Sequence, residues 1–298
     1  MPSHPLTGLS AFPLTPMRRS GTRPGAAEHL DEEAVAHLVT RAAEAGADSV
    51  TMLGSTGSYA YLDRAERRRV VELAVAHAAG TPVLAGVGAL RTSAVLDHVR
   101  DAEEAGADGV LLAPITYQPL SADEVFELFR TVCTHTELPV VLYDNPTTTG
   151  FRFTPALYGR IAALDGIASV KIPPLPADPV EAQDVVDAVR AAVPQHVTVG
   201  ISGDPSAARG LRAGCHAWFS VIGGVLPEAA ARLVRTGDDA HLAPLWPLFA
   251  EHGSLRVAAA AAEHLGLAPA DCLPRPVQGL DPNARHRVAE ALEALTSQ

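Results

Sequence analysis

The chain has 298 residues, of which 47% are hydrophobic and 19% charged, and its formal net charge is −11. This composition supports a sizeable core and argues against disorder. An acidic chain without a basic stripe is a poor candidate for binding nucleic acid or an anionic membrane. No stretch approaches the ~18 consecutive apolar residues of a transmembrane helix, and the first residues lack the basic and apolar segments expected of a signal peptide.

The chain contains an internal repeat. Residues 44–50 read EAGADSV, residues 104–110 read EAGADGV, and residues 213–219 (AGCHAWF) are a looser third copy. An amphipathic helical pattern precedes each copy and an apolar strand pattern follows it. The glycine of each copy falls where the end of a helix needs a left-handed residue. The spacing of about 60 residues between the first two copies accommodates two βα units.

On this period the sequence predicts eight short strands that are apolar on both faces, as buried parallel strands are. They lie near residues 8–12, 48–53, 82–86, 108–112, 139–143, 167–171, 197–201 and 217–221. Helical patterns fill the gaps at 31–45, 63–79, 92–105, 121–136, 154–163, 178–192, 205–213 and 227–236. Ser121 and Asp204 are start signals for two of these helices.

Eight alternations of strand and helix predict an α/β fold of the (β/α)8, or TIM, barrel type over residues 1–236. Residues 237–298 are predicted to form a C-terminal helical extension packed on the barrel, with helices near 239–252, 255–265 and 282–296. An open doubly wound sheet is the alternative, but no GxGxxG turn follows the first strand. In a barrel the active site lies at the C-terminal ends of the strands, so functional residues are sought there.

The cysteines and histidines give no sign of a disulfide or a metal site. Cys133, Cys215 and Cys272 are scattered and lack CxxC spacing, which indicates free thiols in a reducing cytosol and a cytoplasmic protein. The histidines fall mostly in predicted helices or near the N-terminus, and no HExxH motif occurs. We therefore expect no metal.

Lysine usage is the most informative single feature. Of the 23 Lys and Arg residues, 22 are arginine, and the one lysine, Lys171, ends the predicted sixth strand. Arginine cannot replace a lysine whose neutral amine must attack a carbonyl, because a guanidinium stays protonated. The sequence therefore predicts Lys171 to be a catalytic, imine-forming nucleophile. An unperturbed lysine is neutral in only about one molecule in 2,500 at pH 7, so apolar walls must lower its pKa, and the flanking Val170 and Ile172 suit such walls.

Two other strand ends carry groups suited to this chemistry. Tyr143 ends the fifth strand, where a phenol can relay protons. GSTGS (54–58) follows the second strand: its glycines let backbone N–H groups converge, and Ser55 and Thr56 add hydroxyl donors suited to a carboxylate.

Two further turns are open to more than one interpretation. Gly200, Ser202 and Gly203 resemble the carboxylate-binding turn, whereas Asp204 also suits a helix cap. The glycine pair 223–224 after the eighth strand suits either a phosphate site or a tight turn.

Together these segments resemble the dihydrodipicolinate synthase / N-acetylneuraminate lyase family, from AFPLTP at 11–16 through the C-terminal helices. The family pattern has a G-[ST]-T-G turn after strand two, Y-[ND]-x-P after strand five, a Schiff-base lysine ending strand six and S-G-D before helix seven. This chain has GSTG at 54–57, YDNP at 143–146, Lys171 and SGD at 202–204, in the same order.

The resemblance implies a class I aldolase or lyase in which Lys171 forms an imine with pyruvate or another 2-oxo acid, without a cofactor, and Tyr143 relays protons. Ser55 and Thr56 would hold the substrate carboxylate and join the relay. The predicted substrate-binding residues also include Gly54, Gly57, Thr148, Ser202 and Gly203. The resemblance further implies a homotetramer, a dimer of dimers, in which a tyrosine of one subunit completes its neighbour's site.

The chain departs from the family pattern at several positions. The position of the family's relay tyrosine is Thr116, so Tyr117, one residue later, is the predicted substitute. Thr148 stands where dihydrodipicolinate synthases carry an arginine for the aldehyde's carboxylate, and Ser58 replaces a usual Glu. The segment 172–176 (IPPLP) is also unusual. These departures favour an aldolase or lyase acting on another 2-oxo acid.

Three alternatives stay open. The first is a 4-hydroxy-tetrahydrodipicolinate (dihydrodipicolinate) synthase of lysine biosynthesis. The second is a barrel that binds a ligand without turnover, which Thr116 motivates. The third is a phosphate-binding isomerase that uses residues 221–224.

Overall fold

The structure is a computed structural model that describes residues 6–21 and 25–296. Residues 1–5, on which part of the signal-peptide expectation rests, lie outside this range. Within it, no helix is long and apolar enough to cross a membrane.

Eight parallel strands close into a barrel in the order β1-β10-β9-β8-β7-β6-β5-β4, and β4 pairs with β1. The strands are β1 (Gly8–Ala11), β4 (Ser49–Met52), β5 (Val83–Gly86), β6 (Gly109–Leu112), β7 (Val140–Tyr143), β8 (Ile167–Ile172), β9 (Thr198–Ile201) and β10 (Ala217–Ser220). Every strand falls within one residue of a predicted segment, so the predicted TIM barrel is confirmed.

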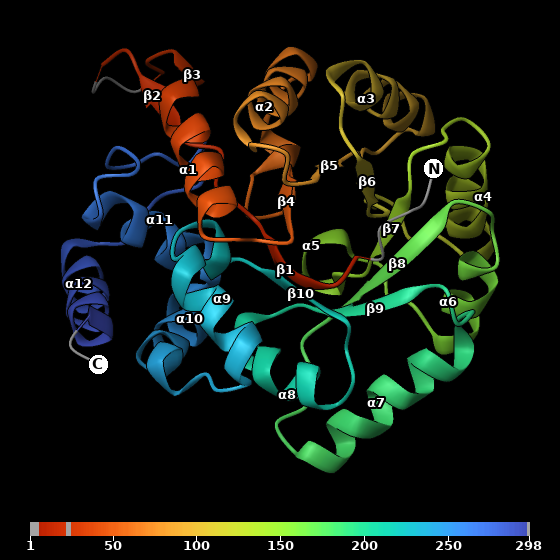
Figure 1. The fold of residues 1–298 in the computed structure, drawn as a ribbon. Helices are drawn as coiled ribbons and strands as arrows, with labels where there is room; N and C mark the ends of the chain where they lie inside the picture. Colours follow the sequence, from red (N-terminus) through yellow and green to blue (C-terminus); the bar gives the residue numbers. More distant parts are fainter. Residues whose placement is uncertain (1–5, 22–24, 297–298) are drawn as a thin grey trace.

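Helices surround the barrel (Figure 1). The ring consists of α1 (Glu32–Glu44), α2 (Arg64–His77), α3 (Thr92–Ala105), α4 (Ala122–Cys133), α6 (Pro155–Ala162), α7 (Pro179–Ala192), α8 (Ala207–Arg212) and α9 (Pro227–Thr236). Beyond it lie η4 (Ala240–Leu245), α10 (Trp246–His252), α11 (Ser254–His264) and α12 (Pro282–Thr296), which Figure 1 shows in blue beside α1 and α9. The predicted helices are therefore present, except that 205–213 is divided between η2 (Asp204–Ser206) and α8, and 239–252 between η4 and α10.

Local sequence signals explain several boundaries. Ser121 accepts a hydrogen bond from the backbone of Glu124, whose carboxylate bonds back to Ser121, so α4 begins with a capping box. The repeat glycines Gly46, Gly106 and Gly214 all have φ between 78° and 97°, the left-handed conformation expected at helix ends. These features depend only on neighbouring residues, which is why the sequence reveals them.

Several short elements were not predicted. The helical turn α5 (Pro146–Thr149) follows β7, and strands β2 (Met17–Arg19) and β3 (Glu28–Leu30) form an antiparallel hairpin. The hairpin is anchored far along the chain. Met17 donates to the carbonyl of Cys272 at 2.8 Å, and the Arg19 guanidinium donates to the carbonyl of Leu273 at 2.8 Å.

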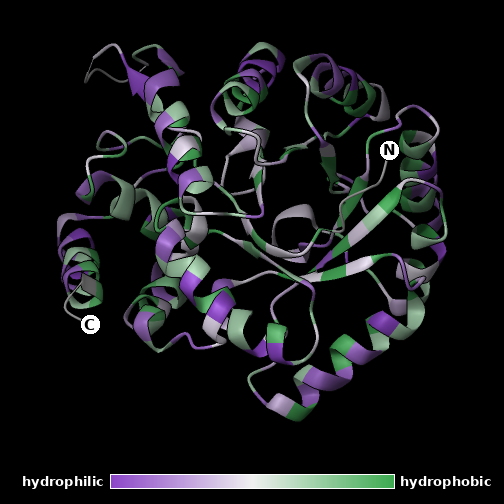
Figure 2. Cartoon of the chain, viewed as in Figure 1, coloured by the Kyte–Doolittle hydropathy of each residue, from purple (hydrophilic) through white to green (hydrophobic). Residues whose placement is uncertain are grey.

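The buried side chains form an inner and an outer layer. Alternate residues of a strand face opposite sides, so β8 directs Lys171 inward and its neighbours outward. Val170 and Ile172 belong to the large cluster between strands and helices. The expectation that they wall the lysine was therefore wrong. The barrel interior holds a separate cluster of Phe12, Leu84, Leu111, Ala113, Val141, Tyr143, Ala217 and Phe219. In Figure 2 the strands are mostly green or pale, whereas the surrounding helices alternate green with purple.

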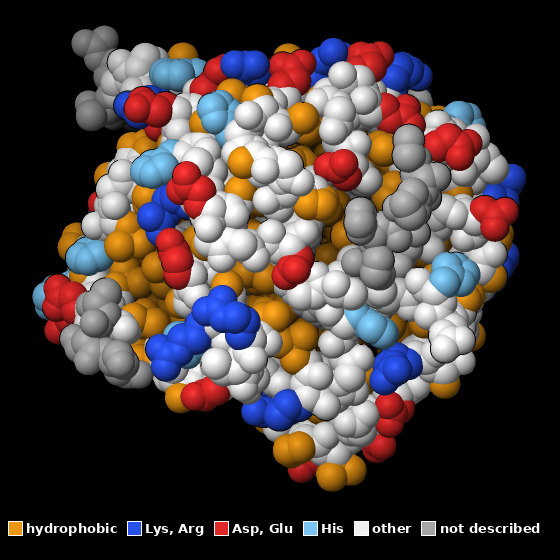
Figure 3. All heavy atoms as spheres, in the orientation of Figure 1, with side chains coloured by type: hydrophobic (Ala, Val, Ile, Leu, Met, Phe, Trp, Pro, Cys, Tyr) orange, Lys and Arg blue, Asp and Glu red, His pale blue; other side chains and the backbone are white. Residues whose placement is uncertain are grey.

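Charges on the surface are mixed in sign, as the sequence indicates. Along α1, α2 and α3, red and blue side chains alternate at the upper edge of Figure 3. Ion pairs join these helices: Arg69 with Glu32 at 2.7 Å, Arg68 with Glu104 at 2.6 Å, and Arg64 with Asp101 at 2.6 Å. Arginines on this face are therefore engaged with neighbouring carboxylates.

Candidate active site

Lys171 lies one residue before the end of β8 and is only 4% exposed. In the barrel register it pairs with Tyr143 on β7 and with Gly200 on β9. Three residues singled out from the sequence therefore lie side by side at the C-terminal ends of adjacent strands.

Three aromatic rings surround the amine of Lys171. Its Nζ lies 4.0 Å from the ring centroid of Tyr143, 5.4 Å from that of Phe12 and 5.8 Å from that of Phe219. The rings of Phe12 and Phe219 pack edge to face with centroids 5.9 Å apart. We call Phe12, Tyr143 and Phe219 the aromatic cage.

The cage lowers the pKa of Lys171. Burial lowers the pKa of the amine to about 7, although Asp204 and Asp144 favour its charged form. Contact with ring faces also attracts a cation, but loss of hydration outweighs both attractions here. About half of the amines are then neutral at pH 7, compared with about one in 2,500 for an ordinary lysine.

The cage needs a glycine next to the lysine. A Cβ atom on Gly200 would lie 2.3 Å from the ring of Phe219, far inside contact distance. The packing of Phe219 beside the lysine therefore requires glycine at position 200. This packing accounts for Gly200 without a role in binding a carboxylate.

Tyr143 is a second group close to the amine that the sequence singled out. It is 3% exposed, and its hydroxyl lies 2.9 Å from Oγ of Ser55 and accepts a hydrogen bond from Nδ2 of Asn145 at 2.7 Å. Burial raises the pKa of Tyr143, and the hydrogen bonds with Ser55 and Asn145 oppose that rise. The structure thus brings Ser55, Tyr143 and Lys171 together.

The turn after β4 has an unusual backbone. Leu53 and Ser58, which flank it, have φ of 58° and 53°, in the left-handed region that non-glycine residues rarely adopt. Thr56 is buried, and within the described residues the N–H groups of Thr56 and Gly57 donate to no protein acceptor. Strained turns with free donors cluster at ligand sites. The geometry is compatible with the predicted carboxylate cradle of Gly54, Ser55, Thr56 and Gly57.

Asp204 does not cap α8, so that interpretation was wrong. Its carboxylate is 1% exposed and accepts from the Trp218 indole at 3.1 Å and from the N–H groups of Val221 and Ile222 at 3.1 and 2.7 Å. Burial raises the pKa of Asp204 to about 6, although these three donors oppose the rise. Asp204 therefore holds the turn after β10 in place.

The backbone N–H groups of residues 221–224 already have acceptors within the protein, which disfavours a phosphate site there. Besides the two N–H groups bound by Asp204, Gly223 donates to Oγ of Ser220 at 2.8 Å and Gly224 donates to the carbonyl of Val221 at 3.1 Å. All four N–H groups that a phosphate would need are bonded within the protein. The glycine pair is a tight turn.

The segment after Lys171 packs on the turn after β9. Ser202 donates from Oγ to the carbonyl of Ile172 at 2.6 Å, and Leu175 donates to Oγ of Ser206 at 3.3 Å. A Cβ atom on Gly203 would lie 2.4 Å from the ring of Pro174. Ser202 and Gly203 thus fix the IPPLP segment, and their predicted contact with substrate stays a prediction.

Three positions that depart from the family pattern, Thr116, Tyr117 and Thr148, are partly or fully exposed. Thr116 donates from Oγ1 to the carbonyl of Thr149 at 2.9 Å. Tyr117 is 86% exposed, so within one chain its phenol faces solvent, and its catalytic role stays a prediction. Thr148 is exposed on α5, as is expected of a residue at the rim.

Sequence reasoning missed Phe12, Phe219 and Asn145. Phe12 and Phe219 resemble ordinary core residues in apolar runs, and only barrel closure shows that they face Lys171. Asn145 had a signal, since it lies within YDNP two residues after Tyr143, but its side-chain direction is set by α5.

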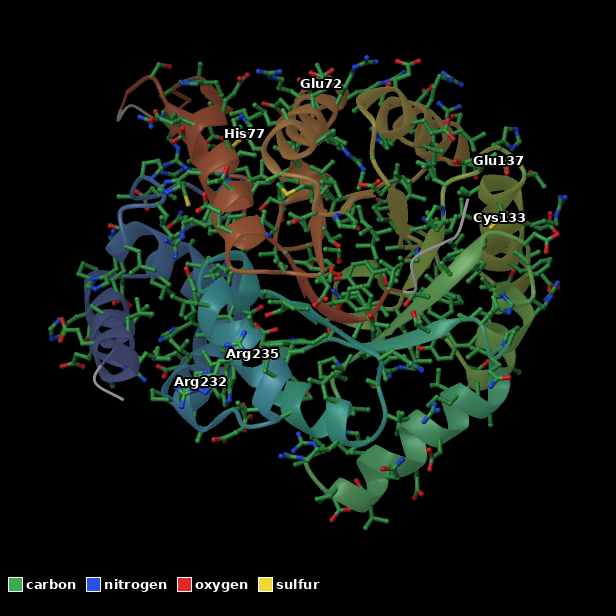
Figure 4. The ribbon with its side chains drawn as sticks, in the orientation of Figure 1. Glu72, His77, Cys133, Glu137, Arg232 and Arg235 are labelled. Carbon is green, nitrogen blue, oxygen red and sulfur yellow. The ribbon has the colours of Figure 1, made fainter. Side chains whose placement is uncertain are left out.

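No group of three or more His, Cys, Asp or Glu side chains in the described part of the chain is placed to hold a metal ion. The cysteines are free thiols, as predicted. Figure 4 shows Cys133 at the outer edge of the molecule, at the end of α4 and away from the barrel interior. Burial raises the pKa of Cys133 to about 11, so its thiol is protonated at neutral pH.

The fold and this site define a (β/α)8-barrel enzyme built around one buried lysine. A family model described as the Dihydrodipicolinate synthetase family matches residues 5–295. The chain belongs to this family, and it is a lyase of the aldolase type.

Individual relatives agree with this assignment. A 4-hydroxy-tetrahydrodipicolinate synthase of Hyphomonas neptunium is 36% identical over 216 residues, 72% of each protein. An uncharacterized DapA-like lyase of Halobacterium salinarum is 31% identical over 215 residues, 71% of this chain and 68% of the relative. Among solved structures, a dihydrodipicolinate synthase from Agrobacterium tumefaciens matches with a TM-score of 0.91 and 42% identity, over 97% of this chain and 98% of that protein.

Proposed function

We propose that this chain forms an imine between Lys171 and a 2-oxo acid such as pyruvate, and makes or breaks a C–C bond beside that imine without a cofactor. One observation carries the proposal. The amine of the only lysine is buried in the aromatic cage, where its pKa falls to about 7, and lies 4.0 Å from the ring centroid of Tyr143.

In the proposed reaction the neutral amine attacks the keto carbon of the 2-oxo acid. The oxygen of the resulting carbinolamine takes the proton of the Tyr143 hydroxyl and leaves as water, while the nitrogen lone pair forms the C=N bond. Ser55, Thr56 and the free N–H groups of their turn hold the carboxylate. The iminium draws electrons from the adjacent carbon, whose proton passes to the Tyr143 phenolate, so that an enamine forms and the phenol is restored. The enamine carbon attacks the carbonyl carbon of an aldehyde, whose oxygen takes the phenolic proton and becomes a hydroxyl, and cleavage is the reverse.

Borohydride trapping tests the imine. Incubation with pyruvate and borohydride is expected to add the mass of pyruvate less one water plus two hydrogens, located on Lys171 by peptide mass spectrometry. Lys171→Arg keeps the positive charge and is expected to give no adduct. Absence of an adduct with every member of a 2-oxo acid panel would contradict the proposal.

We further propose that the second substrate differs from that of the named synthases. The motivating residue is Thr148, exposed on α5, where the resemblance implies an arginine for the aldehyde's carboxylate. Product from pyruvate and aspartate semialdehyde, at a rate no other aldehyde exceeds, would contradict this part. It would instead support the second candidate, 4-hydroxy-tetrahydrodipicolinate synthase, which the names and identities of the relatives favour.

The ligand-binding alternative without turnover is tested in the same assay. We expect turnover of at least one aldehyde, and we expect Lys171→Arg to abolish it while circular dichroism and thermal unfolding remain those of a folded barrel. Imine formation without any turnover would favour the alternative.

We propose that copies of the chain associate as a homotetramer in the cytoplasm. Tyr117 and Leu90, 86% and 65% exposed, are large hydrophobic side chains that an interface would cover. Analytical ultracentrifugation is expected to give a tetramer that Leu90→Asp weakens. If the phenol of Tyr117 completes a neighbour's site, Tyr117→Phe lowers turnover. A monomer at micromolar concentration would contradict the assembly.

A further inference from the structure

The hydroxyl of Tyr143 has two polar partners from different parts of the chain. Ser55 follows β4, and Asn145 lies between β7 and α5. A phenol oxygen has one proton and two lone pairs, whereas the amide nitrogen of Asn145 can only donate. Asn145 therefore occupies a lone pair and leaves the phenolic proton free to point at Ser55 or at a ligand.

Asn145 is itself held by hydrogen bonds within the chain. Its backbone carbonyl accepts from N–H of Thr149 at 3.0 Å and from Oγ1 of Thr149 at 2.9 Å. The carbonyl of Thr149 accepts in turn from N–H of Thr116 at 3.1 Å and from its Oγ1 at 2.9 Å. Thr149, the middle residue of this connection, is 1% exposed.

The connection links the loop after β6 to the phenol. Thr116 donates to the carbonyl of Thr149, and Thr149 donates to the carbonyl of Asn145. The side chain of Asn145 then donates to the hydroxyl of Tyr143. We call Thr116 and Thr149 the brace of Asn145. A Cβ atom on Gly150 would lie 2.6 Å from Oγ1 of Thr116, so the brace packs closely and leaves no room for a larger neighbour. Small and β-branched residues keep this turn in one arrangement.

We propose that Asn145 is a positioning residue for Tyr143, which leaves the phenolic proton free for the carbinolamine oxygen formed at Lys171 and stabilises the phenolate left after transfer, with Thr116 and Thr149 as its brace. This inference rests on the proposed role of Tyr143 in imine formation.

Charge balance supports this role for the amide. When the carbinolamine oxygen takes the phenolic proton, the negative charge left on the phenol oxygen is met by N–H of Asn145 and O–H of Ser55. The proton released from the carbon beside the iminium then restores the phenol. In agreement, the bonds from Ser55 and Asn145 act to lower the pKa of Tyr143 against the effect of burial.

The two polar partners of the Tyr143 hydroxyl come from its own chain, at 2.7 and 2.9 Å. Together they occupy two of the three hydrogen-bonding positions of a phenol oxygen, which leaves one for a ligand.

The test compares Asn145→Leu with Asn145→Asp. Leucine has a similar volume but no donor, and aspartate keeps the shape but presents a carboxylate that cannot donate. Both are expected to lower kcat roughly 10- to 100-fold and leave KM for pyruvate within about twofold, since the carboxylate cradle is unchanged. Thr147→Val, an exposed neighbour on α5, is the matched control and is expected to stay near wild type.

A double-mutant cycle separates positioning from a merely structural role. If Asn145 acts through the phenol, Asn145→Leu has no further effect on kcat in a Tyr143→Phe background. Thr116→Val, which removes only the Oγ1 donor, is expected to reduce kcat a few-fold in the wild-type background and not at all in Tyr143→Phe. An equal loss in both backgrounds, or activity within twofold of wild type for Asn145→Leu or Asn145→Asp, would overturn the inference.

Failure of the proposed function is recognised separately, because wild type would then form no borohydride adduct. In that case NMR of protein labelled with ¹³Cζ-tyrosine decides, with the Tyr143 resonance assigned by Tyr143→Phe. Movement of this resonance in Asn145→Leu but not in Thr147→Val supports the hydrogen bond and its positioning role. An unchanged resonance overturns it.

Discussion

Lys171 and Asp204 are neighbouring buried charges at the mouth of one barrel, and their surroundings are opposite. Asp204 has three N–H donors on its carboxylate, whereas the amine of Lys171 faces the rings of Phe12, Tyr143 and Phe219. Burial disfavours the charge of both groups, but the donors around Asp204 partly offset this cost, whereas the rings around the amine offer it no hydrogen bond. Burial and sequence position alone do not separate the two residues.

The largest expected effect comes from removing the buried amine of Lys171. Because the folded pKa of Lys171, about 7, is below the unfolded value near 10.4, the penalty for burying the ammonium is complete below pH 7 and fades as pH rises toward 10.4. Lys171→Met is therefore expected to abolish the borohydride adduct yet raise the free energy of unfolding by about 4 kcal/mol at pH 6. Urea unfolding at pH 6 and 9 measures this, and the gain should shrink at pH 9. If Lys171→Met were less stable than wild type at pH 6, the proposed penalty for burying the ammonium would be contradicted.

Removing the hydrogen-bonded carboxylate of Asp204 is expected to destabilise the protein. Asp204→Ala leaves the Trp218 indole and the N–H groups of Val221 and Ile222 buried without acceptors. We expect a loss of about 3 kcal/mol in the free energy of unfolding, measured by urea unfolding. Asp178→Ala, which removes an exposed helix cap on α7, is the control and should cost only about 1 kcal/mol. Equal losses in the two variants would mean that the buried hydrogen bonds of Asp204 stabilise the protein no more than an exposed helix cap does.

Removing one ring of the aromatic cage tests whether burial sets the pKa of Lys171. Phe219→Ala admits water beside the amine, so the pKa of Lys171 is expected to rise from about 7 toward its ordinary value. Each unit of rise reduces the neutral amine at pH 7 about tenfold. The rate of pyruvate trapping, measured from pH 6 to 10, should keep its sigmoidal form with a higher midpoint. Phe249→Ala, in the C-terminal helices, should destabilise the protein without moving that midpoint.

The smallest expected effect concerns the backbone of the carboxylate cradle. Ser58 has φ of 53°, and its buried Oγ has no hydrogen-bond partner within the described residues. Ser58→Gly is expected to raise the free energy of unfolding by about 1 kcal/mol, because glycine adopts this conformation without strain. Ser58→Ala keeps the strained Cβ and should gain less. Thermal unfolding distinguishes the two, and a greater gain for alanine would show that the hydroxyl, rather than the backbone, carries the strain.

Much of the fold follows from short-range patterns. The repeat, the apolar strands and caps such as Ser121 depend on residues a few positions apart, so the TIM barrel and its helices could be predicted. The β2–β3 hairpin could not, because its bonds run to Cys272 and Leu273 at the other end of the chain. Asp204 illustrates the same limit, since a local pattern indicated a cap while its partners lie on β10 and the turn after it.

The sequence by itself determined that one lysine ends the sixth barrel strand, with a tyrosine at the end of the fifth and a small hydroxyl-bearing turn after the second. Residue chemistry and strand period suffice for that. Only the tertiary structure decided what surrounds the amine. Val170 and Ile172, adjacent in sequence, face away because a strand alternates its side chains, and Phe12 and Phe219 face inward because barrel closure joins β1 to β10. The turn α5 holds the backbone of Asn145 through Thr149 and so directs its amide toward Tyr143.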